Sequence, residues 1–74
     1  MIELRLHRAL YAGTAVEKAI SAYAAYATFE RADDAMHWVV RIEGGAPERE
    51  ASIAGELGNW ALGVTVKERG GAAR

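Results

Sequence analysis

The sequence predicts a small α+β domain of the ferredoxin-like class, with two helices on one face of an antiparallel sheet and the order β-α-β-β-α, to which a closing strand can be added. Three observations indicate this class. Two segments alternate apolar and polar residues as half-buried strands do, and a third is rich in the β-branched and aromatic residues typical of strands. Two segments have the spacing of amphipathic helices, and 74 residues suffice for one domain only. Because each strand has a single apolar face, both helices must cover that face.

The first strand and the first helix follow from the N-terminal residues. Apolar and polar side chains alternate over residues 2–7, which is the period of a strand with one buried face. Thr14 and Glu17 fit a capping box, in which the threonine hydroxyl accepts from the Glu17 N–H and the glutamate side chain reaches back. We therefore predict a helix from this box to about Ala25. Its apolar stripe is expected at Val16, Ile20, Tyr23 and Ala24.

Two further strands are expected in the middle of the chain. Residues 27–31 alternate again, and residues 36–42 are rich in β-branched and aromatic side chains. Asp33 and Asp34 supply a turn between them, and strands this close in sequence form an antiparallel hairpin. Gly44 and Gly45 are expected to end the hairpin.

The second helix is expected to begin at Pro47, because proline suits the first helical position and the acidic residues that follow favour the positive end of the helix dipole. Gly63 is expected to end it in the left-handed conformation. Beyond that glycine, Val64 and Val66 fit either a short closing strand or an uneven continuation of the helix. The apolar face of the helix is predicted to hold Ile53, Leu57, Trp60 and Ala61.

These elements define one core within a domain of residues 1–69, followed by a frayed tail of residues 70–74. The strands are expected to contribute Ile2, Leu4, Leu6, Phe29, Trp38, Val40 and Ile42. The helices are expected to contribute Val16, Ile20, Tyr23, Ile53, Leu57 and Trp60. Tyr11 and Tyr26 lie at element edges, where a tyrosine can line a partner groove.

Composition excludes several classes of partner. Nine basic and ten acidic residues are interspersed and give a net charge of −1, so the clustered cations that bind nucleic acid are missing from the sequence. No apolar run approaches the roughly 20 residues of a membrane span. Without cysteine or an export signal, a cytoplasmic location is expected. A chain this short has a thin core, and with disulfides excluded a homodimer is the expected supplement.

The sequence lacks the usual material for catalysis. Gly44 and Gly45 precede a helix, but the lysine and hydroxyl residue of a phosphate loop do not follow. Ser21 and Ser52 lie inside predicted helices without the glycines of a nucleophile elbow. We therefore predict a protein that is not an enzyme and carries no cofactor.

His7 and His37 are the only imidazoles, and both are expected on the polar side of the sheet. Together with Glu3 or Glu30 they are a conceivable metal site. The alternative is that both are solvated surface residues. We expect the latter, and no useful affinity for a transition metal in the monomer, because a third strong ligand is missing.

The polar side of the sheet is the strongest candidate for a binding surface. It is expected to carry Glu3, Arg5, Thr28, Glu30, Val39 and Arg41, with charges of both signs. A sheet face without helices can serve as a platform, and edge strands can pair with a peptide or a second subunit. A solvated face without a partner is the alternative. The predicted partner-binding residues are Glu3, Arg5, His7, Glu30, His37 and Arg41.

Two patches of sequence resemble the HxsD-like family, small proteins of the His-Xaa-Ser peptide system. Tyr11, Ala15-Val16, Lys18-Ala19-Ile20 and Tyr23 resemble the family's first helix, and residues 57–62, Leu-Gly-Asn-Trp-Ala-Leu, resemble a stretch of its last helix. The family's last helix continues after the final leucine, whereas this chain has Gly63 there. The resemblance implies an accessory role beside radical-SAM enzymes that modify a small ribosomal peptide, and it brings no catalytic residues.

The sequence therefore predicts a non-enzymatic accessory domain that binds a peptide or protein partner. The alternative belongs to another class, a homo-oligomeric small-ligand-binding or simple enzyme module with its site at a subunit interface. A ferredoxin-like scaffold hosts both.

Overall fold

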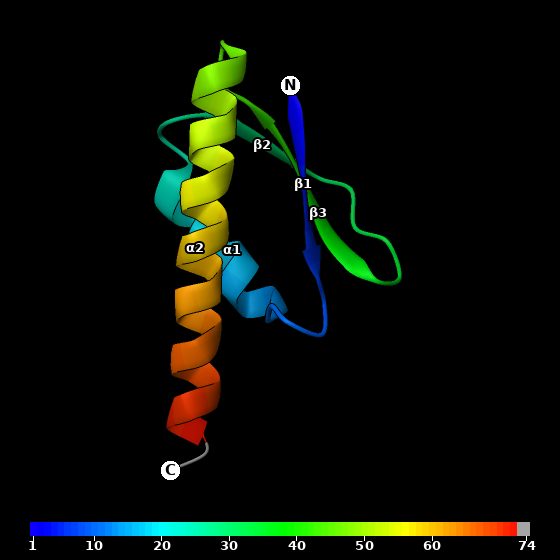
Figure 1. Ribbon diagram of the computed structural model, residues 1–74, viewed down its shortest axis with the longest axis vertical. Helices are drawn as coiled ribbons and strands as arrows, with labels where there is room; N and C mark the ends of the chain where they lie inside the picture. The colour runs from blue at the N-terminus through cyan, green and yellow to red at the C-terminus, as the bar shows by residue number, and fades with distance from the viewer. Residues whose placement is uncertain (73–74) are drawn as a thin grey trace.

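The computed structural model describes residues 1–72, and the side chains of residues 1–69, and it confirms the α+β class (Figure 1). The elements are β1 (Ile2–His7), α1 (Gly13–Tyr23), β2 (Thr28–Arg31), β3 (His37–Glu43) and α2 (Pro47–Ala72). Within the described residues no helix is long and apolar enough to cross a membrane.

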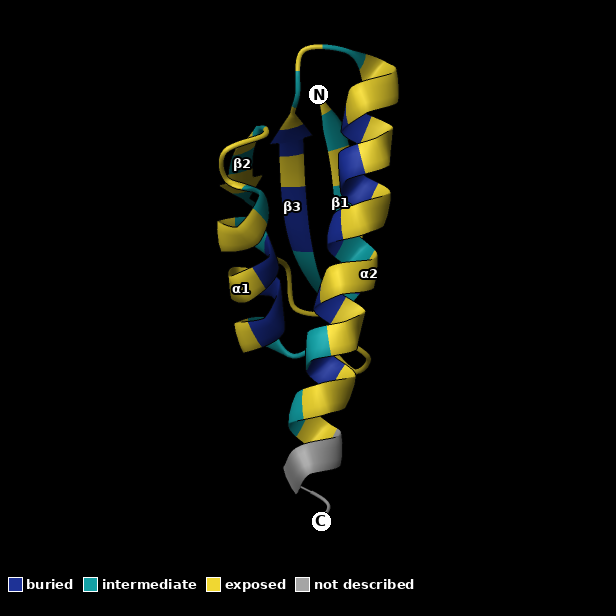
Figure 2. Cartoon of the chain, turned by 90° about the vertical axis from the view of Figure 1, so that its left-hand side faces the viewer, coloured by how far each residue is buried: buried dark blue, intermediate teal, exposed yellow. Residues whose placement is uncertain are grey.

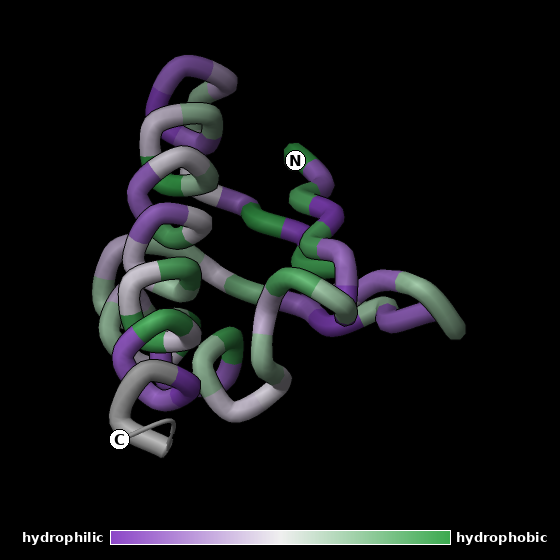
Figure 3. The backbone as a smooth tube through the Cα atoms, turned by 60° about the horizontal axis from the view of Figure 1, so that its bottom comes forward, coloured by the Kyte–Doolittle hydropathy of each residue, from purple (hydrophilic) through white to green (hydrophobic). Residues whose placement is uncertain are grey.

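The three strands form an antiparallel sheet in the order β1-β3-β2. β1 and β2 therefore run parallel, joined through α1 and separated by β3, which is the split βαβ arrangement of the predicted class. Leu4 lies opposite Val40, and Phe29 opposite Ile42, so the apolar residues share one face. The alternation along β1 is visible in the hydropathy colouring of Figure 3. Both helices cover the apolar face and leave the other face of the sheet without a helix (Figures 1 and 2).

The core lies between the sheet and the two helices and contains the predicted apolar residues with one exception. Val16, Ile42 and Leu57 are fully buried. Trp38 is half-buried against this core and donates its indole N–H to the Tyr11 carbonyl at 2.9 Å. Around them pack the other core residues, Leu6, Ala19, Val40, Ile53, Ala54 and Ala61 as buried members and Ile2, Leu4, Tyr11, Ile20, Tyr23, Ala27 and Phe29 as partly buried ones.

Trp60 is the exception, and its assignment to the core was wrong. The buried row of α2 runs through Leu57, Ala61 and Thr65, whereas Trp60 lies on the flank of that row and is 37% exposed. The core takes the small Ala61 at this level of the helix because α1 packs closely against α2. The helical spacing of apolar residues in the sequence did not show which of Trp60 and Ala61 would be buried.

The predicted capping box of α1 was also wrong. The helix begins one residue before Thr14, with Ala12 as its N-cap and no side-chain cap. The Ala12 carbonyl accepts the first helical hydrogen bonds, from Ala15 and Val16 at 3.1 Å each. The Thr14 hydroxyl instead donates to Glu68 at 3.0 Å, so a contact with α2 replaces the local cap. The helix ends at Tyr23, two residues before the expected Ala25.

α2 continues far beyond the predicted stop at Gly63, and the closing strand at Val64 and Val66 does not form. Within the described residues positive φ occurs at Gly45 alone, at 92°, so Gly63 has ordinary helical geometry. Contacts to the rest of the chain hold the C-terminal half of the helix. The first three residues of the predicted tail of residues 70–74 lie within α2, and residues 73–74 lie outside the described part of the chain.

Two buried polar residues fasten α2 to the domain. The Thr65 hydroxyl, 1% exposed, accepts from the Ala12 N–H at 3.1 Å and donates to the Ala61 carbonyl at 2.8 Å. At the other end, Glu50 is 3% exposed, accepts from the Gly44 N–H at 3.0 Å and lies 3.1 Å from the amino-terminal nitrogen. Buried polar groups of this kind cost stability unless they are paired, and each polar atom named in this paragraph has a partner.

Candidate partner-binding face

The six predicted partner-binding residues lie together on the helix-free side of the sheet, here called the outer face. The strand register places Glu3 opposite Arg41, Arg41 opposite Glu30, and His7 opposite His37. The outer face therefore consists of Glu3, Arg5 and His7 of β1, Thr28 and Glu30 of β2, and His37, Val39, Arg41 and Glu43 of β3.

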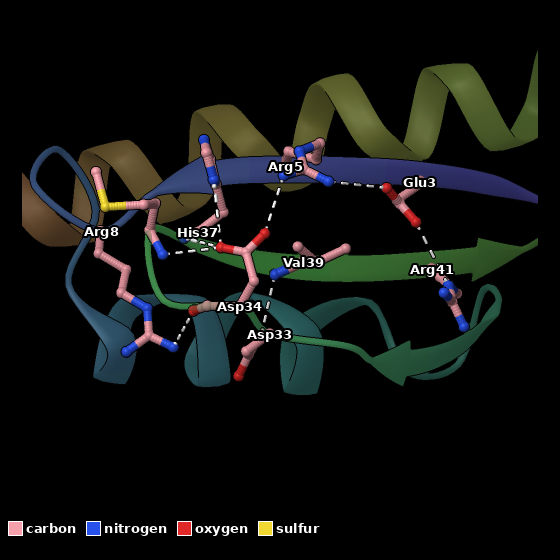
Figure 4. A network of polar contacts seen from close by, with 9 residues as sticks. Glu3, Arg5, Arg8, Asp33, Asp34, His37, Val39 and Arg41 are labelled. Atoms are coloured by element: carbon pink, nitrogen blue, oxygen red, sulfur yellow. Dashed lines mark hydrogen bonds and ion pairs between the residues drawn. The ribbon is translucent and has the colours of Figure 1, made fainter.

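Charges of alternating sign run across the three strands. Arg41 of the central strand lies 3.3 Å from Glu30 on one side. On the other side it lies 3.5 Å from Glu3, and Arg5 lies 3.4 Å from the same glutamate (Figure 4). Each of these side chains is about half exposed, so the pairs add little to the free energy of folding. They hold the charged groups in a fixed order across the sheet.

Asp34, which the sequence indicated only as a turn residue, is the residue around which one end of the outer face is organised. Its carboxylate accepts from the backbone N–H groups of Met36 and His37 at 2.8 and 2.7 Å and from Arg5 of β1 at 2.9 Å. Its carbonyl accepts from Arg8 at 2.5 Å (Figure 4). The Met36 N–H above all, and then the His37 N–H and the nearby Arg5, hold the pKa of Asp34 below its usual value.

Asp33 points away from the outer face. Its carboxylate accepts from Arg31 at 3.0 and 2.7 Å and from the Val39 N–H at 3.0 Å. The Arg31 guanidinium is the main reason that the pKa of Asp33 is lowered. Val39 is on the outer face as expected, but it is only 2% exposed, because it lies between Arg5 and the Asp33–Asp34 segment. That residue therefore offers no surface to a partner.

The two histidines lie side by side, with ring centroids 5.2 Å apart and the rings nearly perpendicular. Nδ1 of His7 accepts from the Ala9 N–H at 3.1 Å, which leaves Nε2 of that ring as the free nitrogen. Nδ1 of His37 lies 3.4 Å from the Asp34 carboxylate but outside hydrogen-bonding geometry. Over the described residues, no group of three histidines and acids is placed to hold a metal ion.

The outer face has more acid than base. Its carboxylates, including Asp34, number four, against two guanidinium groups and the amino-terminal ammonium, which lies 3.6 Å from Glu43. The acids are Glu3, Glu30, Asp34 and Glu43, and the arginines are Arg5 and Arg41. An acidic excess on a surface attracts cationic segments and repels anionic ones.

A groove lies on the helix side of the molecule, between the C-terminal end of α1 and the first turns of α2. It is an open groove of about 400 Å³. Tyr26, which the sequence placed at an element edge, lines it and is 57% exposed. Arg49 crosses the groove and donates to the Tyr26 carbonyl at 2.9 Å. The other lining residues are Tyr23, Ser52, Ile53 and Glu56.

Comparison with known proteins gives no relative: no family model, no curated protein and no solved structure matches the chain.

Proposed function

We propose that the protein is a non-enzymatic binding domain that engages a peptide or protein partner through the outer face of its sheet. The observation that carries the proposal is that one whole face of a three-stranded sheet is left without a helix while its charged side chains are held in a fixed order. A face of this kind presents side chains at the regular spacing of the strands.

The charges on this face favour a partner segment with basic residues. Glu3 pairs with Arg5 and Arg41, and Glu30 pairs with Arg41, yet both acids keep exposed carboxylate surface, with side chains 41% and 64% exposed. A lysine or arginine from a partner can bind these carboxylates without displacing Arg41. Such contacts are screened by salt, so binding is expected to weaken as ionic strength rises.

The resemblance to the HxsD-like family adds a candidate for the partner. The difference at Gly63 is smaller than the sequence suggested, because α2 continues beyond that residue as the family's last helix does. On this proposal the partner is a small ribosomal peptide or the radical-SAM enzyme that modifies it, and the cytoplasm is the place of action.

The test is a titration of the ¹⁵N-labelled protein with a synthetic peptide of alternating lysine and valine, followed by NMR. We expect shifts concentrated on the amides of β1, β3 and the Asp34 segment, with an affinity that falls as salt is raised. Glu3→Gln combined with Glu30→Gln should weaken binding about tenfold, while Glu48→Gln on exposed α2 should leave it unchanged. Shifts confined to the helices, or equal affinity in all variants, would reject the outer face as the site.

A second candidate function rests on the groove between the helices. Its volume lies within the range of small-molecule sites, and Arg49 beside Tyr23 and Tyr26 suits an anionic ligand with an apolar body. This is the ligand-binding alternative, although the groove lies within one chain and not between subunits. Small aromatic carboxylates, added to the labelled protein in the same NMR experiment, test this alternative. Binding in the groove would shift the amide signals of Tyr23 and Ser52.

A further inference from the structure

We propose that two copies of the chain pair through their β1 strands, antiparallel and about a twofold axis at Leu4, to give one continuous six-stranded sheet. β1 is an edge strand, with β3 on one side and no strand on the other (Figure 1). The proposal rests on this edge and does not depend on the function proposed for the outer face.

The backbone of β1 presents a defined set of groups to its free side. The Arg8 N–H bonds to the Met36 carbonyl at 3.0 Å, which continues the β1–β3 ladder. Because residues of an antiparallel strand direct their N–H and C=O groups alternately to the two sides, the even-numbered residues of β1 face β3. The groups of Glu3 and Arg5 therefore face the open edge, where a second strand can bond to them.

The side chains of β1 then select one register. Pairing must keep apolar residues on the helix side, so residues with the same parity lie opposite one another. With the axis at Leu4, Glu3 of each copy faces Arg5 of the other, twice over, and Ile2 faces Leu6 on the apolar side. Moving the axis one residue in either direction places Glu3 against Glu3 or Arg5 against Arg5, which is repulsive.

This register also continues the charge order already present within one chain. Glu30, Arg41 and Glu3 alternate across the three strands, and Arg5 of the second copy becomes the next charge in the row. The twofold axis generates a second, identical row of charges that runs in the opposite direction. The sequence of β1 is thus complementary to itself, which favours a second copy over a foreign strand as the occupant of the edge.

One flank of α2 carries two glycines and leaves room for a close neighbour. Residues 51, 55, 58 and 62 recur at helical spacing on one flank, away from the groove residues Arg49, Ser52 and Glu56, which face α1. Gly55 and Gly58 have nothing within 4 Å of the place a Cβ would take. No contact in the chain requires glycine there, and Leu62 beside them is 41% exposed. A second α2 brought up by strand pairing would lie against this flank.

Two charge variants test the pairing and its register together. Arg5→Glu gives a strand with acids at positions 3 and 5, and Glu3→Arg gives one with arginines at both. We expect each variant to sediment as a monomer at concentrations where the wild-type protein is a dimer, and an equimolar mixture to recover the dimer. Lys67→Glu, an exposed charge reversal on α2, is the matched control and should dimerise as wild type does. Circular dichroism checks that each chain is folded.

A crosslink gives an independent measurement. The chain has no cysteine, so Leu4→Cys introduces a single thiol at the proposed axis. Leu4 and its mate would be a pair without mutual backbone hydrogen bonds, with Cα atoms about 4.5 Å apart, which a disulfide can span. We expect a covalent dimer on mild oxidation, formed at least tenfold faster than with Thr28→Cys on the other edge strand. A wild-type protein that stays monomeric at high micromolar concentration, a mixture of charge variants that stays monomeric, or equal crosslinking at both edges would overturn the proposal.

Discussion

Thr65 of α2 closes the N-terminal end of α1, because its hydroxyl accepts from the backbone N–H of Ala12, the residue that caps that helix. The two residues are 53 positions apart. The same hydroxyl donates to the Ala61 carbonyl, so one buried side chain joins two helices.

Thr65→Val should therefore lower the free energy of unfolding by about 1–3 kcal/mol, because it leaves the Ala12 N–H buried without a partner at nearly constant volume. Thr65→Ser keeps the hydroxyl and should cost less than about 1 kcal/mol, the worth of one methyl group. Urea unfolding of the two variants measures the difference. Equal losses would show that the hydrogen bonds of Thr65 contribute no more than its methyl group.

The two tryptophans should behave very differently on truncation. Trp38 packs against the core, bonds to Tyr11 and lies under Arg8 at 4.0 Å, so Trp38→Ala should cost about 3 kcal/mol. Trp60 lies on the flank of α2, and Trp60→Ala should cost less than about 1 kcal/mol. Urea unfolding followed by circular dichroism measures both. A loss under 1 kcal/mol for Trp38→Ala would remove that residue from the core.

Gly63→Ala should stabilise the protein by about 0.5–1 kcal/mol, because alanine is the better residue inside a helix. Nothing lies within 4 Å of the place its Cβ would take, so no steric cost opposes the gain. A left-handed glycine at this position would give the opposite sign. Thermal unfolding thus tests directly that α2 continues through Gly63.

Stability should depend on pH at both ends of the range through Glu50. The Gly44 N–H above all, and then the amino-terminal ammonium, hold the pKa of Glu50 below its usual value. The carboxylate therefore contributes stability above the unfolded pKa of about 4.3, and this is lost as the pH falls through the lower folded value. Glu50 in turn raises the pKa of the amino group. That contribution is present below the unfolded value of about 8 and lost as the pH rises through the folded one.

Glu50→Gln should flatten both limbs of this profile while its amide oxygen still accepts from Gly44. Glu48→Gln, an exposed substitution in the same turn, is the control and should leave the profile unchanged. Urea unfolding between about pH 3 and pH 9 measures the free energy for each chain. A profile of Glu50→Gln that matches wild type would show that other groups set the pH dependence.

The strands and the outer face could be predicted from the sequence because their signals are local. The alternation over residues 2–7 and 27–31 fixes which side chains share a face, and antiparallel pairing with residues 37–43 then brings Glu3, Arg41 and Glu30 together. The role of Asp34 could be predicted only in part. Its bonds to the N–H groups two and three residues later follow from local turn chemistry, whereas Arg5, 29 positions away, does not.

The errors have a common physical cause, which is that contacts between helices override local preference. Gly63 and Thr14 have good local signals for a helix stop and a helix cap. The structure instead pairs Thr14 with Glu68, and Lys18 lies 2.8 Å from the same carboxylate. These contacts hold α2 in a helix past Gly63 and replace the cap of α1. No local pattern in the sequence carries information about partners some 50 residues apart.

The position of β3 between two earlier strands governs how the chain behaves while it is being synthesised. β1 precedes β3 in the chain, yet β3 is the strand that β1 bonds to in the described residues, and it follows α1 and β2. Until β3 emerges from the ribosome, the apolar side of residues 2–6 has no sheet to join, and Ala12 has no Thr65 to bond. Folding must therefore wait for most of α2, and contacts this distant in sequence slow it. The nascent chain meanwhile exposes an unpaired, self-complementary strand, so crowding on polysomes should promote association between neighbouring chains before either has folded.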